Sequence, residues 1–198
     1  MGKGRLGVQK YSDRELTEGC RRGDLYYREL LYKRYFSLAM SISLRYADDR
    51  NEAMDIVNDS YMKVLDNLSE YDDERPFASW YSRIVVNTAI DRYRSRVRYN
   101  ETLTTLSEDC LSKEEQREPD IDAELSAGEI LELFSHLPDN YRLTFNLYEI
   151  EGYSHHEIGE MLGISASASR SNLTRAKQML RELYRRTYVT ARKDHGRV

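Results

Sequence analysis

The chain has few cysteines, and their positions suit neither a disulfide framework nor a metal site. Cys20 and Cys110 lie far apart in the 198-residue sequence, with no CxxC pair and no cysteine–histidine spacing typical of zinc. The default expectation is two reduced thiols in a cytosolic protein. A fold held together by disulfides is therefore not expected.

Long apolar runs are also missing. The N-terminal residues have no hydrophobic segment of the signal-peptide kind, and no later run approaches the roughly 18 apolar residues that a transmembrane helix needs. We therefore expect a soluble, cytoplasmic protein with no direct membrane insertion. The net charge is -4, which argues against a uniformly basic nucleic-acid binder, so any such contact must come from a local basic surface.

Motifs for catalysis are absent from the sequence as well. It has no Gly-rich phosphate loop, no nucleophile elbow and no catalytic pair of acids. His155 and His156 lack further ligands at metal spacing, and we expect both to be solvent-facing residues of a capped helix. We predict no metal, no cofactor and no enzymatic activity for the chain itself.

Prolines are scarce, and between them apolar residues recur every three or four positions without sustained alternation. This spacing predicts an all-α fold. Helices are expected at about 24–44 and 51–68, and from Pro76, which suits the first turn of a helix. Ser12 and Glu15 fit a capping box that begins an earlier helix.

Residues 101–124 differ in composition from the rest of the chain. They are rich in Glu, Asp, Ser and Thr, with scattered Leu and one Pro. Such a segment is typical of an exposed acidic linker. It predicts a boundary between two small helical domains.

The C-terminal part contains a helix-turn-helix pattern. Ser154 and Glu157 form a second capping box, for a short helix. Gly163 then allows a left-handed turn, and Ser165 can cap a last helix that runs to about Tyr184. In this geometry the second helix enters the major groove of DNA by its N-terminal residues.

The leading end of the last helix carries small and hydroxyl side chains, followed by basic ones. Small residues let the backbone approach DNA closely, hydroxyls can bond phosphates or base edges, and Arg170 can make a bidentate contact to guanine. The alternative is a helical hairpin with a solvated face, which would favour Glu, Lys and Gln. The predicted contacts to duplex DNA are Ser165, Ala166, Ser167, Ser169, Arg170, Thr174 and Arg175.

Several blocks in order give a family resemblance. The segments "NEAMDIVNDSYMKVLDNLSEYD" and "PFASWYSRIVVNTAIDRYRSR" resemble the second conserved region of bacterial extracytoplasmic-function (ECF) sigma factors, the small specificity subunits of RNA polymerase. The segments "LPDNYRLTFNLYEIEGYSHHEIGEMLGIS" and "SRSNLTRAK" resemble the fourth. The resemblance implies an all-α fold with a region 2 helical bundle and a region 4 helix-turn-helix, joined by the acidic linker. The implied divisions are an N-terminal tail (1–11), the region 2 domain (12–99), the linker (100–122), the region 4 domain (123–186) and a C-terminal tail (187–198).

The resemblance implies core RNA polymerase as a partner. In this family the helix matching residues 51–68 binds the clamp helices of the beta-prime subunit, and its polar face here presents carboxylates to a basic partner. A merely solvated helix face is the alternative. The implied polymerase-binding residues are Asp55, Asn58, Asp59, Lys63 and Asp66.

The resemblance also assigns the loop "SEYDDERP" and the helix after it to the minus-ten promoter element. Opening a promoter takes a base out of its stack, at a cost that a pocket and aromatic surfaces must offset. Trp80 as a core residue and Asn87 as an ordinary surface residue stay open as alternatives. The implied contacts are Tyr71, Asp72, Arg75, Trp80, Arg83, Asn87, Arg92 and Arg94, with the pocket formed by 71–75.

Further partners follow from the resemblance alone. An anti-sigma factor, including a membrane-bound one, is expected, and the acidic linker either follows the RNA exit path of polymerase or is simply solvated. Where many family members have Gly-Thr-Val after the serine cap, this chain has Ser-Ala-Ser at 167–169, which leaves its base preference unassigned. The residues expected near the flap of the beta subunit, some of which core packing explains equally well, are Tyr141, Arg142, Phe145 and Tyr148.

The prediction is a sigma factor that binds core RNA polymerase and directs promoter-specific transcription initiation. Two other classes stay open: a helix-turn-helix regulator that binds closed duplex DNA without polymerase, and a helical adaptor that binds a protein partner. The aromatic and arginine-rich helix, paired with an acidic helix before the linker, favours the sigma factor because a repressor needs neither.

Overall fold

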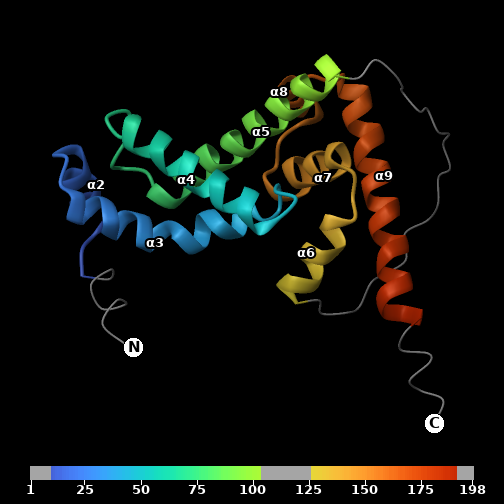
Figure 1. The fold of residues 1–198 in the computed structure, drawn as a ribbon, viewed down its shortest axis with the longest axis horizontal. Helices are drawn as coiled ribbons and strands as arrows, with labels where there is room; N and C mark the ends of the chain where they lie inside the picture. The colour runs from blue at the N-terminus through green and yellow to red at the C-terminus, as the bar shows by residue number, and fades with distance from the viewer. Residues whose placement is uncertain (1–9, 104–125, 191–198) are drawn as a thin grey trace, which may run out of the picture.

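The computed structural model describes residues 10–103 and 126–190, and in these ranges every regular element is a helix (Figure 1). The prediction of an all-α fold is confirmed. No helix among the described residues is long and apolar enough to cross a bilayer. The elements in chain order are α2 (Asp13–Arg21), α3 (Leu25–Ser43), α4 (Arg50–Asp66), α5 (Phe77–Leu103), α6 (Ala127–Ser135), α7 (Asp139–Phe145), the π-helical turn η1 (Asn146–Ile150), α8 (His155–Leu162), α9 (Ala166–Tyr184) and the π-helical turn η2 (Arg185–Thr190).

Local sequence signals begin several helices as predicted. Ser12 with Glu15 forms a capping box at α2, and Ser154 with Glu157 forms one at α8. In each box the serine hydroxyl accepts a hydrogen bond from the glutamate N–H, and the glutamate carboxylate accepts one from the serine N–H. A third box, which the sequence analysis did not predict, begins α6. These helix starts are therefore fixed by residues within one turn of them.

Helices α2 to α5 pack around an aromatic core. Phe77, the first residue of α5, is 1% exposed. Its ring centroid lies 4.7 Å from that of Tyr35, 5.3 Å from that of Tyr71 and 5.6 Å from that of Trp80. Aromatic pairs at such distances add about 0.5–1.5 kcal/mol each beyond the area that they bury. Helices α2 to α5 form the N-terminal half of the molecule, and the first turn of α5 is anchored in its core.

The C-terminal half, from α6 to η2, contains the predicted helix-turn-helix, which is formed by α8 and α9. Gly163 ends α8 with a φ of 72°, the left-handed conformation that favours glycine. At Gly159 an added Cβ would lie 2.7 Å from the Ile164 carbonyl oxygen, so a side chain there would push the turn away from α8. Ile158 on α8 and Ala176 on α9 are fully buried and help to fix the angle between the two helices.

The two halves of the molecule touch. Leu143, Leu147 and Ile158 of the C-terminal half belong to the same buried cluster as the core of the N-terminal half. Helix α8 contacts α5, so the first helix of the helix-turn-helix lies against the long helix of the other half (Figure 1). The hydrophobic cores of the halves are therefore continuous.

The predicted domain boundaries stay predictions. Helix α5 continues to Leu103, past the predicted end of the first domain at 99. Most of the predicted acidic linker and of both predicted tails lies outside the described residues, as does Cys110. Cys20 is buried and is a free thiol, and its burial raises its pKa to about 11.

Candidate nucleic-acid interface

The leading end of α9 presents a polar surface. Ser165 caps the helix, its hydroxyl accepting a hydrogen bond of 3.0 Å from the Ala168 N–H. Ser167, Arg170 and Thr174 are exposed along the first turns. Their spacing of three, four and seven places them on one helical face, as predicted for a helix that enters a groove.

Ser169 does not belong to this surface, and the expectation that it faces outward is wrong. Its side chain is fully buried, and its hydroxyl lies 3.0 Å from Nδ1 of His155. The helical period explains the burial, because position 169 shares a face with the buried positions Asn172, Leu173 and Ala176. Ser169 therefore joins α9 to α8.

His155 is likewise not the solvent-facing residue that the sequence analysis expected. Its ring stacks on Tyr148, with a centroid distance of 4.4 Å and an interplanar angle of 16°. Burial lowers the pKa of His155, and the positive charge of Arg170 lowers it further. His156, the next residue, is exposed as expected. The sequence signal that was missed is the position of His155. It is the first residue after a helix cap, and it faces the second helix.

Arg175 lies farther along α9 and is partly buried. Its Nη1 donates to the Tyr141 hydroxyl at 3.3 Å, which connects α9 with α7. The Thr174 hydroxyl donates to the Arg170 carbonyl oxygen at 3.1 Å, a bond inside α9. Arg175 thus has a packing role in this structure, and its predicted contact to a DNA phosphate stays a prediction.

The predicted minus-ten surface is carried by α5 and the loop before it. Trp80 is half-buried, with its ring centroid 4.9 Å from that of Tyr71. Arg83 and Asn87 are exposed. Positions 80, 83 and 87 share one face of α5, so an aromatic edge, a guanidinium and an amide lie in a row.

Tyr71 itself is buried, and its predicted place in an open pocket is wrong for this structure. Its ring packs against Phe77 and Trp80, and its hydroxyl donates to the Arg75 carbonyl oxygen. An aromatic core close to the loop was not evident from the loop sequence alone. Tyr71 therefore supports Trp80 and shapes the loop instead of lining a cavity.

The loop between α4 and α5 is held by an arginine that the sequence analysis missed. Arg21, in the last turn of α2, pairs with Asp73 at 2.8 Å. It also donates to the carbonyl oxygens of Leu68, at 3.1 Å, and Tyr71, at 3.0 Å. This contact holds the pKa of the Asp73 carboxyl below its usual value, because Arg21 donates hydrogen bonds to it.

Two loop residues that were predicted to meet DNA remain at the surface. The Asp72 carboxylate accepts from the Glu74 N–H at 3.1 Å and pairs with Arg75 at 3.4 Å. The Asp72 and Arg75 side chains are 55% and 75% exposed, so the pair leaves both accessible. The structure thus keeps this part of the predicted pocket open to solvent.

The predicted polymerase-binding face of α4 is exposed but partly paired. Asp55 and Asp59 both accept from Arg92 on α5, at 3.4 and 2.9 Å. Lys63 pairs with Asp91 at 2.8 Å. The face that was predicted to meet polymerase and a residue that was predicted to meet DNA are therefore in contact with each other.

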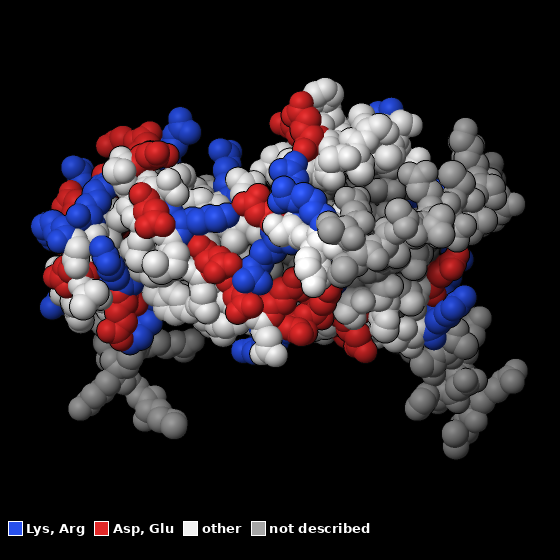
Figure 2. Space-filling model, turned by 45° about the horizontal axis from the view of Figure 1, so that its top comes forward, with Lys and Arg blue, Asp and Glu red and all other residues white. Residues whose placement is uncertain are grey.

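The two other residues of this face, Asn58 and Asp66, differ from each other. The Asn58 Oδ1 accepts from the Tyr32 hydroxyl at 3.1 Å, while Asp66, at the end of α4, is exposed. On the side of the molecule seen in Figure 2, basic and acidic side chains lie interspersed. Positive charge does not dominate this side, so the predicted local basic surface stays a prediction.

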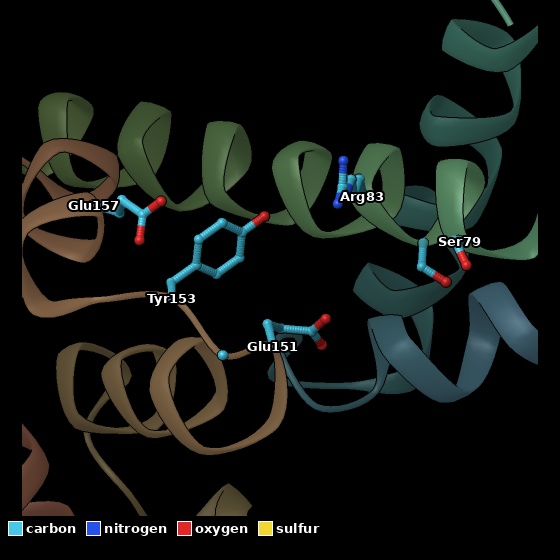
Figure 3. A pocket seen from close by; sticks show the side chains of 7 residues that line it. Ser79, Arg83, Glu151, Tyr153 and Glu157 are labelled. Carbon is cyan, nitrogen blue, oxygen red and sulfur yellow. The ribbon is translucent and has the colours of Figure 1, made fainter. Parts of the chain in front are cut away.

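A cleft of about 600 Å³ separates α5 from the segment that joins η1 to α8 (Figure 3). Arg83 lines its α5 side, and Glu151 and Glu157 lie on the other wall. The remaining lining residues are Ser79, Ser82, Gly152 and Tyr153. Within the described ranges, no group of three or more His, Cys, Asp or Glu side chains could hold a metal ion.

These observations indicate the class of protein to which the chain belongs. The helix-turn-helix has hydroxyl and basic side chains at its leading end, and a second helix carries a half-exposed tryptophan beside exposed polar groups. The chain is thus an all-helical protein with a helix-turn-helix of the DNA-binding kind, and its second polar helix, in the other half of the chain, is a further candidate for DNA contact.

Comparison with known proteins narrows the class. The chain matches the family profile described as Sigma-70 region 2 over residues 31–99 and the one described as Sigma-70, region 4 over residues 127–180. It is 27% identical to the ECF RNA polymerase sigma-E factor of Haemophilus influenzae, over 87% of this chain and 95% of that protein. It is 30% identical to the ECF RNA polymerase sigma factor SigW of Bacillus subtilis, over 68% of this chain and 76% of that protein.

A solved structure of the sigma factor RpoE with the anti-sigma factor NepR, from Bartonella quintana, aligns with 81% of this chain and 96% of its own at 18% identity and a TM-score of 0.48. By its two regions and its relatives, the chain belongs to the sigma-70 family, as an ECF-type RNA polymerase sigma factor. It therefore directs transcription initiation by RNA polymerase and is a non-catalytic subunit.

Proposed function

We propose that this sigma factor divides its work among three surfaces. The polar face of α4 binds the beta-prime clamp helices of core polymerase, α5 with its preceding loop reads and opens the minus-ten element, and the leading end of α9 reads the minus-thirty-five element. The observation that carries the proposal is the row formed by Trp80, Arg83 and Asn87, because a closed-duplex regulator has no use for a stacking aromatic. The protein acts in the cytoplasm, where its polymerase is.

The minus-thirty-five contact rests on the capped start of α9. With Ser165 satisfying the first turn, Ser167, Arg170 and Thr174 are left exposed. Arg170 has the reach and the fork geometry for a bidentate bond to guanine, worth about 1–3 kcal/mol of discrimination. Ala166 and Ser165 allow close approach of the backbone. Arg175 reaches a phosphate only by releasing Tyr141.

The minus-ten contact rests on the half-buried state of Trp80. One side of its ring is supported by Tyr71 and Phe77, so the remaining surface is held rigidly for a base to stack on. Stacking of a base on an aromatic side chain is worth about 1–3 kcal/mol, which offsets much of the cost of unstacking it from the duplex. Arg83 and Asn87 supply phosphate and base-edge contacts beside it.

The polymerase contact rests on the exposed acidic face of α4. A basic partner surface competes with Arg92 for Asp55 and Asp59, and that competition releases Arg92 toward DNA. Asn58, Lys63 and Asp66 extend the same face. An anti-sigma factor as a further partner is carried over from the family resemblance.

The proposal is tested by reconstituting the full chain with core polymerase. Promoter-dependent transcripts are expected, and Trp80→Ala is expected to reduce them on duplex promoters but not on a template whose minus-ten region is already unpaired. Tyr99→Ala, at an exposed aromatic of the same helix, is the matched control and should transcribe like the unaltered chain. Absence of transcripts, or an equal loss on both templates, would contradict the proposal.

A further inference from the structure

The loop between α4 and α5, residues 67–76, is tied to α2 by the side chain of Arg21. The guanidinium donates from Nε to the Leu68 carbonyl oxygen at 3.1 Å and from Nη2 to the Tyr71 carbonyl oxygen at 3.0 Å. Its Nη1 and Nη2 also donate to the two carboxylate oxygens of Asp73, at 2.8 and 3.2 Å. The loop and α2 lie side by side (Figure 1). One side chain therefore holds three residues of the loop, and we call this set of bonds the Arg21 clamp.

Thr17 completes the clamp from one turn earlier in α2. Its side chain is fully buried, and its hydroxyl lies 3.2 Å from Oδ1 of Asp73. Positions 17 and 21 are four apart, so they lie on one face of the helix. Both precede the segment 31–99 that matches the region 2 profile. The clamp is therefore not accounted for by the part of the chain that defines the family.

Further bonds inside the loop keep its shape. The Tyr71 hydroxyl donates to the Arg75 carbonyl oxygen, and the Arg75 N–H donates to the Asp72 carbonyl oxygen at 3.0 Å. The Glu74 N–H donates to the Asp72 carboxylate at 3.1 Å. The loop is thus a compact turn, and the backbone beneath its exposed side chains is held from within the loop and from α2.

The clamp also affects the charge that the loop presents. Four of its residues are acidic: Glu70, Asp72, Asp73 and Glu74. Carboxylates repel the phosphates of DNA. The hydrogen bonds from Arg21 hold the pKa of the Asp73 carboxyl below its usual value, so that carboxylate is ionised and paired at neutral pH. The Asp73 side chain is 25% exposed, against 55% for Asp72, so the clamp removes one of the four carboxylates from the DNA-facing side.

The position of the loop matters because it leads into α5, where the proposed function stacks an unpaired base on Trp80. If the loop had to become ordered when the base arrives, that cost would add to the cost of unstacking the base. Groups that receive a ligand must be held within about 0.5 Å of their working positions by the residues behind them. A side chain that fixes two carbonyl groups and a carboxylate of the loop gives that support.

We propose that Arg21 is a positioning residue for promoter opening, which holds the loop in the shape that receives the unpaired minus-ten base and does not itself touch DNA. The proposal rests on the proposed function, in which this loop and α5 act on the minus-ten element. Arginine suits the role because its planar fork bonds to several acceptors at once, whereas a lysine ammonium is a point charge. Asp73 is then an internal acceptor and not a DNA contact.

The shape of the loop is tested first in the free, full-length chain, by deuterium exchange of the loop amides followed by mass spectrometry. Arg21→Gln removes the fork, and exchange at Glu74 and Arg75 is expected to become about tenfold faster, as for lost hydrogen bonds to a charged group. Lys33→Gln is the matched control. It also removes one positive charge from an exposed ion pair, with Glu29 inside α3, and should leave the loop unchanged.

A second variant weakens the clamp from the other side. Asp73→Asn keeps the shape of the side chain and every residue of α2, and it should speed exchange in the same loop. Circular dichroism shows whether each variant keeps its helices, which separates loosening of the loop from unfolding. Unchanged exchange in both variants, with helices intact, would overturn the clamp.

The role in promoter opening is tested with core polymerase. Arg21→Gln should slow opening of a duplex promoter about tenfold, while the affinity for core polymerase and transcription from a template with an unpaired minus-ten region stay within about twofold of the unaltered chain. Merely structural damage would lower all three, and that result would overturn the positioning role.

Arg21→Lys separates the fork from the charge. It should open the duplex promoter as slowly as Arg21→Gln, because the ammonium cannot bond to Leu68, Tyr71 and Asp73 together. Normal opening with lysine would show that the charge alone matters, as in a direct contact to a phosphate, and would overturn the positioning role.

Trp80→Ala in the same assay separates this proposal from the proposed function. Normal opening of duplex promoters by Trp80→Ala would contradict the proposed function. If Trp80→Ala is slow and Arg21→Gln opens as fast as Lys33→Gln, the positioning role alone fails. In either case the exchange result decides whether Arg21 holds the loop, so the two failures are distinguishable.

Discussion

The two helices proposed to face DNA differ in what surrounds them. On α9 the polar leading end, with Ser167 and Arg170, is exposed and fixed by a local cap. On α5, Arg92 is paired with two carboxylates of α4, and Arg94 is bonded to the backbone of α8. The helix proposed to read closed duplex is thus preformed. The helix proposed to act on opened DNA has internal partners that must first be displaced.

The largest expected effect comes from removing the buried aromatic side chain that anchors α5. Phe77→Ala should lower the free energy of unfolding by about 3–5 kcal/mol, because it empties a fully buried aromatic site in contact with Tyr35, Tyr71 and Trp80. Urea unfolding followed by circular dichroism measures it. Leu25→Ala, at a side chain that is 76% exposed, is the control and should change stability by less than about 0.5 kcal/mol. Similar losses at both positions would show that α5 is not anchored in this core.

The next largest effect is expected on DNA binding by the preformed surface of α9. Arg170→Ala should weaken binding of a holoenzyme to minus-thirty-five DNA by about 1–3 kcal/mol and relax the preference for one base pair. A filter-binding series with single base changes measures both. Ser169→Ala is the contrasting variant: it should lower stability through the lost bond to His155 while keeping the base preference. Altered base preference in Ser169→Ala would place that residue back among the DNA contacts.

A smaller effect is expected at the cap. Ser165→Ala removes the acceptor for the Ala168 N–H and should cost about 1 kcal/mol of stability. Ser171→Ala, at an exposed serine inside α9, should be neutral or slightly stabilising because alanine is the better helix former. Thermal unfolding compares the two. Equal outcomes for them would mean that the start of α9 does not depend on its cap.

The smallest effect is a pH dependence at the joint between α8 and α9. The pKa of His155 is lowered in the folded protein, so its contribution to stability is fully present above about pH 6.5 and is lost as the pH falls through the lowered value. The unaltered chain should therefore lose more stability between pH 7 and 5 than His155→Asn does. The exposed neighbour provides the control, as His156→Asn should keep the steeper slope. Identical slopes in all three chains would exclude this role of His155.

Much of the fold followed from local patterns. The capping boxes at Ser12 and Ser154, the left-handed Gly163 and the cap Ser165 were each predicted, because each depends on residues within one helical turn. The exposed positions Ser167 and Arg170 of the candidate site were predicted for the same reason. Their face follows from the helical period once the start of α9 is known.

The failures have a common physical cause. Ser169 and His155 were misplaced because each is polar and yet bonds to the other across about fourteen positions of sequence, with Ser169 buried and His155 partly buried. Tyr71 was misplaced because the aromatic core that receives it is assembled from α3, α5 and the loop together. Polarity of a side chain does not reveal whether a distant partner will satisfy it after burial.

By itself, the sequence determined where α2, α8 and α9 begin, which family the chain resembles and that Ser167 and Arg170 lie on the leading end of α9, since capping and helical period act over a few residues. Only the tertiary structure decided that Arg92 would pair with α4, and that Arg142 would be buried in a ring with Asp48, Arg96 and Asp139. Ion pairs between distant segments depend on how helices pack. Packing arises from the summed contacts of the whole chain, which no local pattern contains.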